Sequence, residues 1–91
     1  MTPSFEFDNA KSASNKIKHG IDFNEAQRLW ADDKLLVASA RFGREPRWIA
    51  IGLIADKLWT AVFTHRDDAL RIISVRRARN NEIENYYGRR I

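Results

Sequence analysis

The chain has 91 residues and a net charge of +4, which fits one small domain over residues 1–91. A domain of this size buries about 60–65% of its unfolded surface, so it has little room for an enclosed cofactor. The absence of cysteine excludes disulfides, thiolate metal sites and cysteine nucleophiles. No apolar run reaches the ~20 residues of a membrane helix, and no secretory signal is visible. We therefore expect a cytoplasmic protein with no membrane contact, no metal and no cofactor.

Basic residues are concentrated in the C-terminal third of the chain. Between residues 66 and 91, seven arginines stand against four acidic residues, and the four arginines between 71 and 79 have no acidic residue among them. The planar guanidinium group matches phosphate oxygens. This distribution favours nucleic acid as the partner, with an acidic protein as the second candidate and a solvated basic face as the third.

Two short helices are predicted near the N-terminus. Asp8 is placed to cap the start of the first helix, and Gly20 is placed to end it in the left-handed conformation. The apolar positions between them follow helical spacing: Ala10, Ala13 and Ile17. Asp22 and Glu25 open the second helix as a capping box with Asp in place of the usual Ser or Thr. Its apolar face is formed by Phe23, Ala26 and Trp30.

Beyond residue 33 the composition becomes typical of strands. Runs of strand length occupy residues 34–42, 47–54, 58–65 and 70–77, with short turns at 43–46, 55–57 and 66–68. Successive hairpins predict an antiparallel meander. A last helix is predicted over residues 80–87, with Ile83, Tyr86 and Tyr87 on one face and Gly88 as its stop. The expected fold class is α+β: two N-terminal helices, a four-stranded antiparallel sheet and a C-terminal helix, with helices on one sheet face.

The fourth predicted strand carries both apolar residues and arginines on each face. Strict alternation places Leu70, Ile72, Ser74 and Arg76 on one face, and Arg71, Ile73, Val75 and Arg77 on the other. Periodicity alone therefore leaves open which face is buried. At least one of these arginines is expected at a strand end or in a groove.

Two groups of residues resemble the signatures of BrnT-type toxins. The first consists of Phe5-Glu-Phe-Asp8, Lys11, Asn15 and Lys18-His-Gly-Ile21, continued by Phe23, Glu25 and Ala26. The second consists of Arg47-Trp48, Ile51-Gly52, Arg66 and Arg71-Ile-Ile-Ser-Val-Arg-Arg-Ala78, closed by Glu82 and a tyrosine at 86 or 87. The chain departs from the family pattern at Phe7, Val75 and Arg79, where Trp, Ala and Thr are usual.

The resemblance implies a RelE-like fold and the toxin of a type II toxin–antitoxin system. It implies an endoribonuclease that cleaves RNA and inhibits translation, and a BrnA-type antitoxin that neutralises it in a 2:2 complex. Operator DNA would be bound only through the antitoxin. RNA is cut when its own 2′-OH attacks the neighbouring phosphate, so a protein needs to position the strand, assist proton transfer and stabilise charge. We therefore expect a metal-independent reaction.

Five basic residues are the catalytic candidates. Arg76 and Arg77 are expected to contact phosphate together with Arg47, while His19 and Lys18 assist. Each has a structural alternative. One arginine of the pair could bridge to Glu82 or to an aspartate, and cations at the end of a helix are favoured by its dipole.

Further residues are expected to bind RNA around this group: Arg66, Arg71, Trp48 and Tyr87. Arg66 could instead form an ion pair with Asp67 or Asp68, and either tyrosine could pack against Ile83 or stand near the scissile phosphate. Glu82 could act as a general base held by arginine. Asp8 is more simply explained as a helix cap than as a catalytic partner of Glu6.

Two rival functions remain open at this level. In the first, the chain is a non-enzymatic partner that binds an antitoxin and helps to repress transcription. In the second, it binds nucleic acid without cutting it. Incubation of the purified protein with RNA, with and without ribosomes, separates both from the ribonuclease.

Overall fold

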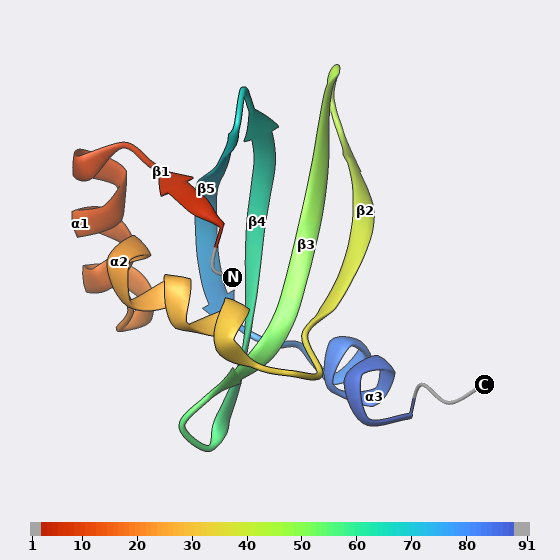
Figure 1. Cartoon of the computed structure of the whole chain (residues 1–91). Coiled ribbons are helices and arrows are strands. Elements are labelled where there is room, and N and C mark those ends of the chain that lie inside the picture. Colours follow the sequence, from red (N-terminus) through yellow and green to blue (C-terminus); the bar gives the residue numbers. More distant parts are fainter. Residues whose placement is uncertain (1–2, 89–91) are drawn as a thin grey trace.

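The computed structural model describes residues 3–88, apart from the side chains of residues 41 and 42. One sheet with the strand order β1-β5-β4-β3-β2 forms its centre. The N-terminal helices lie on one side of this sheet, and α3 lies at the other side near one end (Figure 1). The elements in chain order are β1 (Ser4–Glu6), α1 (Asn9–His19), α2 (Phe23–Ala26), the 3₁₀ helix η1 (Gln27–Ala31), β2 (Leu36–Phe42), β3 (Glu45–Ile54), β4 (Lys57–Arg66), β5 (Ala69–Arg77) and α3 (Asn80–Gly88).

The α+β class, the four-strand meander and the C-terminal helix are confirmed, but the predicted sheet was wrong in one respect. It has five strands and is mixed, because β1 pairs in parallel with the start of β5. A three-residue strand is too short to show a periodic pattern, and its partner is 65 residues away. The second predicted helix is α-helical only over α2 and continues as η1.

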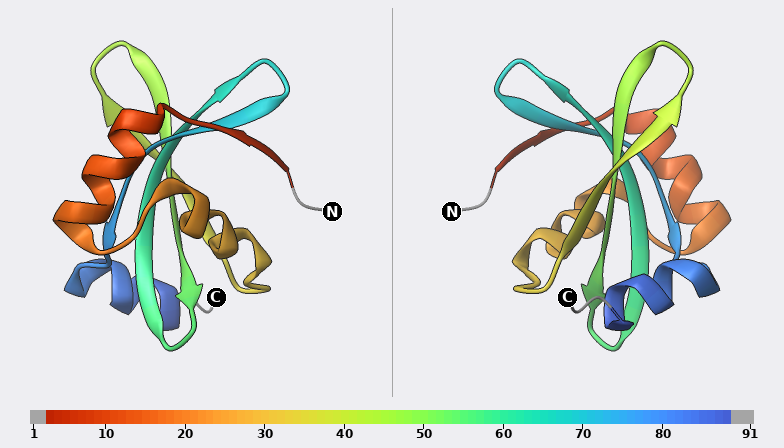
Figure 2. Two further views of the ribbon diagram at one scale, coloured as in Figure 1. Left: turned by 90° about the vertical axis from the view of Figure 1, so that its left-hand side faces the viewer. Right: turned by 90° about the vertical axis from the view of Figure 1, so that its right-hand side faces the viewer.

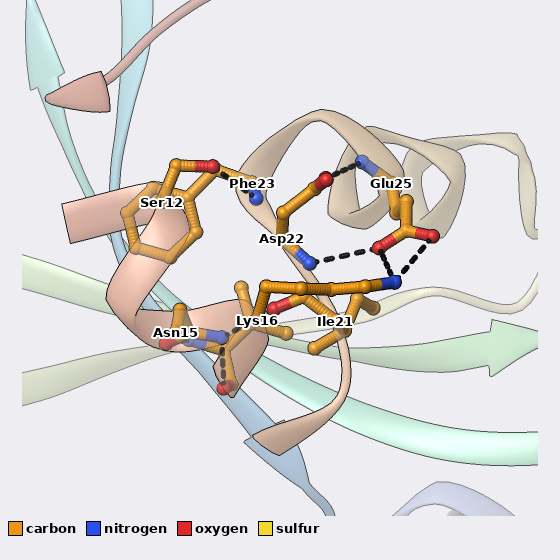
Figure 3. A network of polar contacts seen from close by, with 8 residues as sticks. Ser12, Asn15, Lys16, Ile21, Asp22, Phe23 and Glu25 are labelled. Carbon is orange, nitrogen blue, oxygen red and sulfur yellow. Dashed lines mark hydrogen bonds and ion pairs between the residues drawn. The ribbon is translucent and has the colours of Figure 1, made fainter. Parts of the chain in front are cut away.

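The caps of the N-terminal helices agree with the sequence. Asp8 accepts a hydrogen bond from the N–H of Lys11, and Gly20 has a left-handed φ of 81°. Asp22 and Glu25 form a complete capping box. Lys16 adds an ion pair to Glu25 at 2.8 Å (Figure 3).

The apolar positions of α1 do not face the core, contrary to their helical spacing. Ile17 is 89% exposed, and Ala10 and Ala13 are exposed as well. The helix instead buries two polar residues. Ser12 accepts the N–H of Phe23 through its hydroxyl, which ties α1 to the start of α2 (Figure 3). Hydrogen bonds to backbone outside the helix therefore decide which face of α1 is inward.

Asn15 is the second buried polar residue of α1, and it completes an edge of the sheet. β1 covers β5 only as far as Arg71, which leaves the backbone of Val75 without a neighbouring strand on the side away from β4. The Asn15 amide accepts the N–H of Val75 at 3.2 Å and donates to its carbonyl at 2.9 Å. It also donates to the carbonyl of Ile21 at 2.8 Å. One side chain thus takes the place of a strand; Figure 3 shows the position of Asn15 on α1.

Asp32 has a similar role near the other edge. β2 pairs with β3 only from Leu36, opposite Ile51, so the N–H of Leu53 lies beyond the ladder. The Asp32 carboxylate accepts this N–H at 2.9 Å and the hydroxyl of Tyr86 at 2.6 Å. The end of η1, the end of β3 and α3 are therefore joined at one carboxylate.

Strict alternation along β5 was also wrong, because the strand contains a β-bulge. Val62 pairs with Ser74 while Phe63 pairs with Ile72, so Ile73 has no partner across the ladder. An extra residue shifts the alternation by one position. Ile72 and Val75 consequently pack in the same buried cluster, although alternation placed them on opposite faces.

The two sheet faces are covered unequally (Figure 2). The larger core lies beneath α1, α2 and η1 and includes Phe23, Leu29 and Phe63. A smaller cluster of Ile51, Leu58 and Tyr86 lies beneath α3 at one end of the opposite face (Figure 2), so the prediction that the helices cover one sheet face was wrong for α3. The remainder of that face carries the polar residues described next. No helix within the described residues is long and apolar enough to cross a membrane.

Candidate nucleic-acid interface

A hollow of about 270 Å³ lies on the sheet face opposite the N-terminal helices. Three strands and the segment before α3 supply its lining residues, which we call the arginine hollow: Arg47, Val62, Ser74, Arg76 and Arg79. Pairing of Val62 with Ser74 places them side by side, and the bulge keeps Ser74 and Arg76 on this face. Three of the five lining residues are cations, which suits an anionic ligand.

Arg47 has a donor that nothing in the described structure satisfies. Its Nε atom is buried and has no hydrogen-bond partner. A buried donor left unpaired costs about 1–3 kcal/mol, and such groups are few in native proteins. An oxygen atom of a ligand in the arginine hollow is one way to satisfy this donor.

Arg76 is held in place by Glu82. The two side chains form a bidentate ion pair, with nitrogen–oxygen distances of 2.8 and 2.9 Å. The same carboxylate accepts the hydroxyl of Thr60 at 2.9 Å and the N–H of Arg79 at 2.8 Å. The ion pair and these hydrogen bonds lower the pKa of Glu82 to about 2 and raise that of Arg76. Glu82 is therefore a structural anion, because a carboxylate of so low a pKa is a poor general base near neutral pH.

Arg77 points to the opposite face of the sheet. Its guanidinium lies 5.4 Å from the ring centroid of Trp59, which packs against the larger core. Neighbouring residues of a strand face opposite sides. Arg76 and Arg77 consequently do not approach one phosphate group together, and Arg77 does not line the arginine hollow.

A family model described as the ribonuclease toxin, BrnT, of type II toxin–antitoxin systems matches residues 7–82. The chain belongs to the BrnT family. The resemblance seen in the two sequence signatures is confirmed, and a ribonuclease toxin paired with an antitoxin is the description of this family. A search among curated proteins gave no match.

Several BrnT signature residues serve the fold. Asn15 completes the β5 edge, as described above, and Gly52 makes room for η1. A Cβ atom at Gly52 would lie 2.9 Å from Leu35 Cδ1, 3.2 Å from Asp32 Oδ2 and 3.3 Å from Leu29 Cδ2. Glu82 closes the second signature and anchors Arg76.

Arg66 and Arg71 are both directed to Glu6 on β1. Arg71 contacts this carboxylate at 3.1 Å and Arg66 lies 3.8 Å from it. The partner of Arg66 is thus Glu6, and not the adjacent Asp67 or Asp68 proposed as the alternative. This partner could not be predicted from the sequence, because β1 is too short to show a periodic pattern. Neither arginine lines the arginine hollow.

His19 and Lys18 lie in the last turn of α1, on the side of the sheet covered by the N-terminal helices (Figure 2). Neither residue lines the arginine hollow. The structure therefore divides the five catalytic candidates. Arg47 and Arg76 share one site, whereas Arg77, Lys18 and His19 lie outside it.

The two aromatic candidates also lie outside the arginine hollow. Trp48 is partly buried, packs on the larger core and meets His65 edge-on, with 4.7 Å between ring centroids. Tyr87 is 63% exposed at the end of α3, in a separate hollow with Asp33, Lys34 and Leu53. Tyr86 is the buried tyrosine, so the prediction that Tyr87 shares its packed face was wrong.

Three residues of the site were not among the predicted site residues. Arg79 belonged to the acid-free arginine cluster and Ser74 to the second signature, on the same face as Arg76, but neither was assigned a role, and Val62 carried no signal of its own. The position of Arg79 just before Glu82 could have suggested it, because the Arg79 N–H and the Arg76 side chain share that carboxylate. Among the described residues, no group of three or more acidic or histidine side chains could hold a metal ion.

Proposed function

We propose that this chain is an endoribonuclease that cuts RNA at the arginine hollow. The observation that carries the proposal is the buried, unpaired Nε of Arg47 at a site lined by two further arginines. One carboxylate, Glu82, neutralises Arg76 and leaves the other two arginines available for a phosphodiester. Membership of a family of ribonuclease toxins supports the same ligand class.

The size of the arginine hollow suits one phosphodiester of a longer strand. Its volume of about 270 Å³ is below the ~300–1,000 Å³ of pockets that enclose drug-sized ligands. The surrounding sheet face is open, so an RNA strand could cross it with one phosphate in the hollow. Guanidinium groups bind phosphate oxygens in pairs, which fixes the orientation of the strand.

The proposed reaction is attack by the ribose 2′-OH on the adjacent phosphorus. The bond to the 5′-oxygen breaks, the proton of the 2′-OH passes to water, and the leaving oxygen takes a proton from water. The products are a 2′,3′-cyclic phosphate and a 5′-hydroxyl end. Arg47 and Arg79 stabilise the additional negative charge on the phosphate oxygens, and Arg76 is held near them by Glu82. None of these steps requires a metal or a cofactor.

Cleavage of a single-stranded RNA by purified variants tests the site. Arg47→Gln and Arg79→Gln are each expected to lower the rate about 10²–10³-fold, the usual loss for one charge-stabilising donor. The matched control is Arg28→Gln, because Arg28 is an exposed arginine on η1, away from the arginine hollow. Thermal unfolding of each variant shows that the fold is retained.

Three outcomes would contradict this assignment. Cleavage at the wild-type rate by folded Arg47→Gln would remove the arginine hollow as the active site. A hundredfold loss in His19→Asn with no loss in Arg47→Gln would move the reaction to the end of α1. Absence of cleavage by the wild-type protein, with and without ribosomes, would favour the non-enzymatic co-repressor.

We further propose that cleavage inhibits translation and that a BrnA-type antitoxin neutralises the chain in a 2:2 complex. Operator DNA would be bound only through the antitoxin. Family membership supports the existence of an antitoxin partner. Growth arrest on induction, relieved by co-expression of the antitoxin, is the expected result. Normal growth with soluble, folded protein would contradict it.

A further inference from the structure

Over residues 36–40, β2 forms an edge of the sheet that lacks the usual protection against pairing. Within residues 3–88 its one partner strand is β3, with a regular register from Leu36 to Phe42. Edge strands are commonly protected by charged residues, proline or bulges. Residues 36–40 contain no charged residue and no proline, and Val37 is 46% exposed. A strand of this kind is a template for pairing with another chain.

The opposite edge of the sheet is protected in the same molecule, because its outermost strand, β1, has only three residues. β1 pairs with the start of β5, and the Asn15 amide bonds to the backbone of Val75 farther along that strand. Because one edge of the sheet is protected and the β2 edge is not, the unprotected edge is a specific feature of β2. The difference points to β2 as an interaction surface.

The hairpin geometry identifies which backbone groups of β2 face outward. Gly43, with φ of 62°, and Arg44 form a two-residue turn between Phe42 and Glu45. The pair that flanks such a turn is hydrogen-bonded, and bonded pairs then alternate along the ladder. The N–H and C=O groups of Ala38 and Ala40 therefore bond to β3. Those of Val37 and Ser39 face outward.

A hollow adjoins each end of this exposed stretch. One, of about 320 Å³, is lined by Ser39, Ala40 and residues of the β2–β3 hairpin, including Arg44 and Arg47. The other, of about 340 Å³, lies between Leu36 and the end of α3. In strand addition, backbone hydrogen bonds supply affinity and hollows for alternate side chains supply specificity. Outward-facing backbone groups and adjoining hollows are both present along β2.

We propose that the outer edge of β2 receives an extended segment of the antitoxin, which adds a sixth strand to the sheet. Residues 34–47 contain four basic residues and one acidic residue, so the hairpin favours an acidic strand. A second copy of this chain would bring the same cations together. The acidic side chains would face the hairpin end, since the hollow at the α3 end includes Glu84.

This position explains how the antitoxin would block the ribonuclease. Arg47 lines both the hollow at the hairpin and the arginine hollow. A carboxylate on the added strand would compete with RNA for this guanidinium. The inference rests on the antitoxin partner proposed above, but not on the details of the cleavage reaction.

A proline at Ser39 tests the proposal with the antitoxin of the same toxin–antitoxin pair as the probe. Ser39→Pro removes an outward N–H, and proline is tolerated on edge strands at such positions. We expect antitoxin binding to weaken at least about 100-fold, because backbone hydrogen bonds and close approach are both lost. Ser39→Ala retains the N–H and is the matched control, with binding within about threefold of wild type. RNA cleavage by free Ser39→Pro should be unchanged.

Amide hydrogen exchange of the wild-type complex gives an independent readout. The amides of Val37 and Ser39 should exchange rapidly in the free chain and slow at least about 100-fold in the saturated complex. Those of Ala38 and Ala40 bond to β3 in both states and serve as internal controls. This measurement decides the question even if Ser39→Pro fails to fold.

Several results would overturn the proposal. They are wild-type affinity in folded Ser39→Pro, unprotected Val37 and Ser39 amides in the complex, or protection of these amides by self-association of the free chain. A wild-type chain that cuts RNA but does not bind its antitoxin would also refute this inference while leaving the ribonuclease intact. Loss of RNA cleavage in Arg47→Gln, together with unchanged antitoxin binding by Ser39→Pro, would refute the strand addition alone.

Discussion

Replacement of Glu82 by Gln should destabilise the fold in a manner that depends on pH. The Glu82 carboxylate is largely buried and accepts bonds from Arg76, Thr60 and the N–H of Arg79. Gln retains the shape of the side chain but removes its charge. The NH₂ group of Gln is a donor, and it faces the donors that bonded to the carboxylate oxygen it replaces. Arg76 is then left partly buried without its anion. Breaking one partner of a buried pair typically costs about 3–5 kcal/mol.

The pKa of Glu82 gives a second measure of the same effect. Its pKa falls from the ordinary 4.5 to about 2 in the folded protein. A depression of this size corresponds to about 3 kcal/mol of stability at neutral pH. Because the folded-state pKa is lowered, this stability is present above pH 4.5 and is lost as the pH falls toward 2. We expect a Tm difference of about 15 °C at pH 7.

Urea unfolding followed by tryptophan fluorescence measures the difference between wild type and Glu82→Gln. The difference should be about 3 kcal/mol at pH 7 and about half as large at pH 3. Glu84→Gln is the matched control, because Glu84 is an exposed carboxylate on the same helix. Its effect should remain within about 0.5 kcal/mol at each pH.

Two results would refute this reasoning. A loss below about 1 kcal/mol at pH 7 would mean that the ion pair barely offsets the desolvation of its members. A difference between wild type and variant that stays constant from pH 7 to pH 3 would mean that the Glu82 charge is not the source of the stability.

Two further substitutions test the packing of the sheet. Gly52→Ala should lower the free energy of unfolding by about 1–3 kcal/mol in thermal unfolding, because the new Cβ would overlap Leu35. Gly88→Ala is the control and should be neutral, because a Cβ there meets no atom within 4 Å. Equal stability of the two variants would contradict the expected overlap. Asn15→Ala should cost about 2–4 kcal/mol in urea unfolding, because three buried hydrogen bonds are lost. Ser14→Ala on the exposed side of α1 is its control, and a loss below about 1 kcal/mol for Asn15→Ala would show that water replaces the amide.

The local features of this fold were predictable from the sequence. Asp8 and Gly20 bound α1, and Asp22 with Glu25 opens α2, because each cap is formed by hydrogen bonds within a few residues. The four long strands were predictable because their composition and the short turns between them are local as well. The family was predictable because two signatures occur in the right order over most of the chain.

The candidate site depended on contacts that only the tertiary structure decided. The bulge at Ile73 places Ser74 opposite Val62 and Arg76 opposite Thr60, and no local pattern marks it. Composition marked the arginine cluster, but the faces of β5 determined that Arg76 lines the hollow while Arg77 packs on Trp59.

The same distinction explains the first helix and the first strand. The helical spacing of Ala10, Ala13 and Ile17 predicted the helix but not its buried face, and Asn15 faces inward because the backbone of Val75, 60 residues away, needs a partner. β1 forms because β5 offers an open ladder 65 residues later in the chain. Helix caps and turns satisfy backbone groups a few residues away, and sequence displays them directly. Sheet edges and buried charges are satisfied by distant residues, so their partners are determined only when the chain is folded.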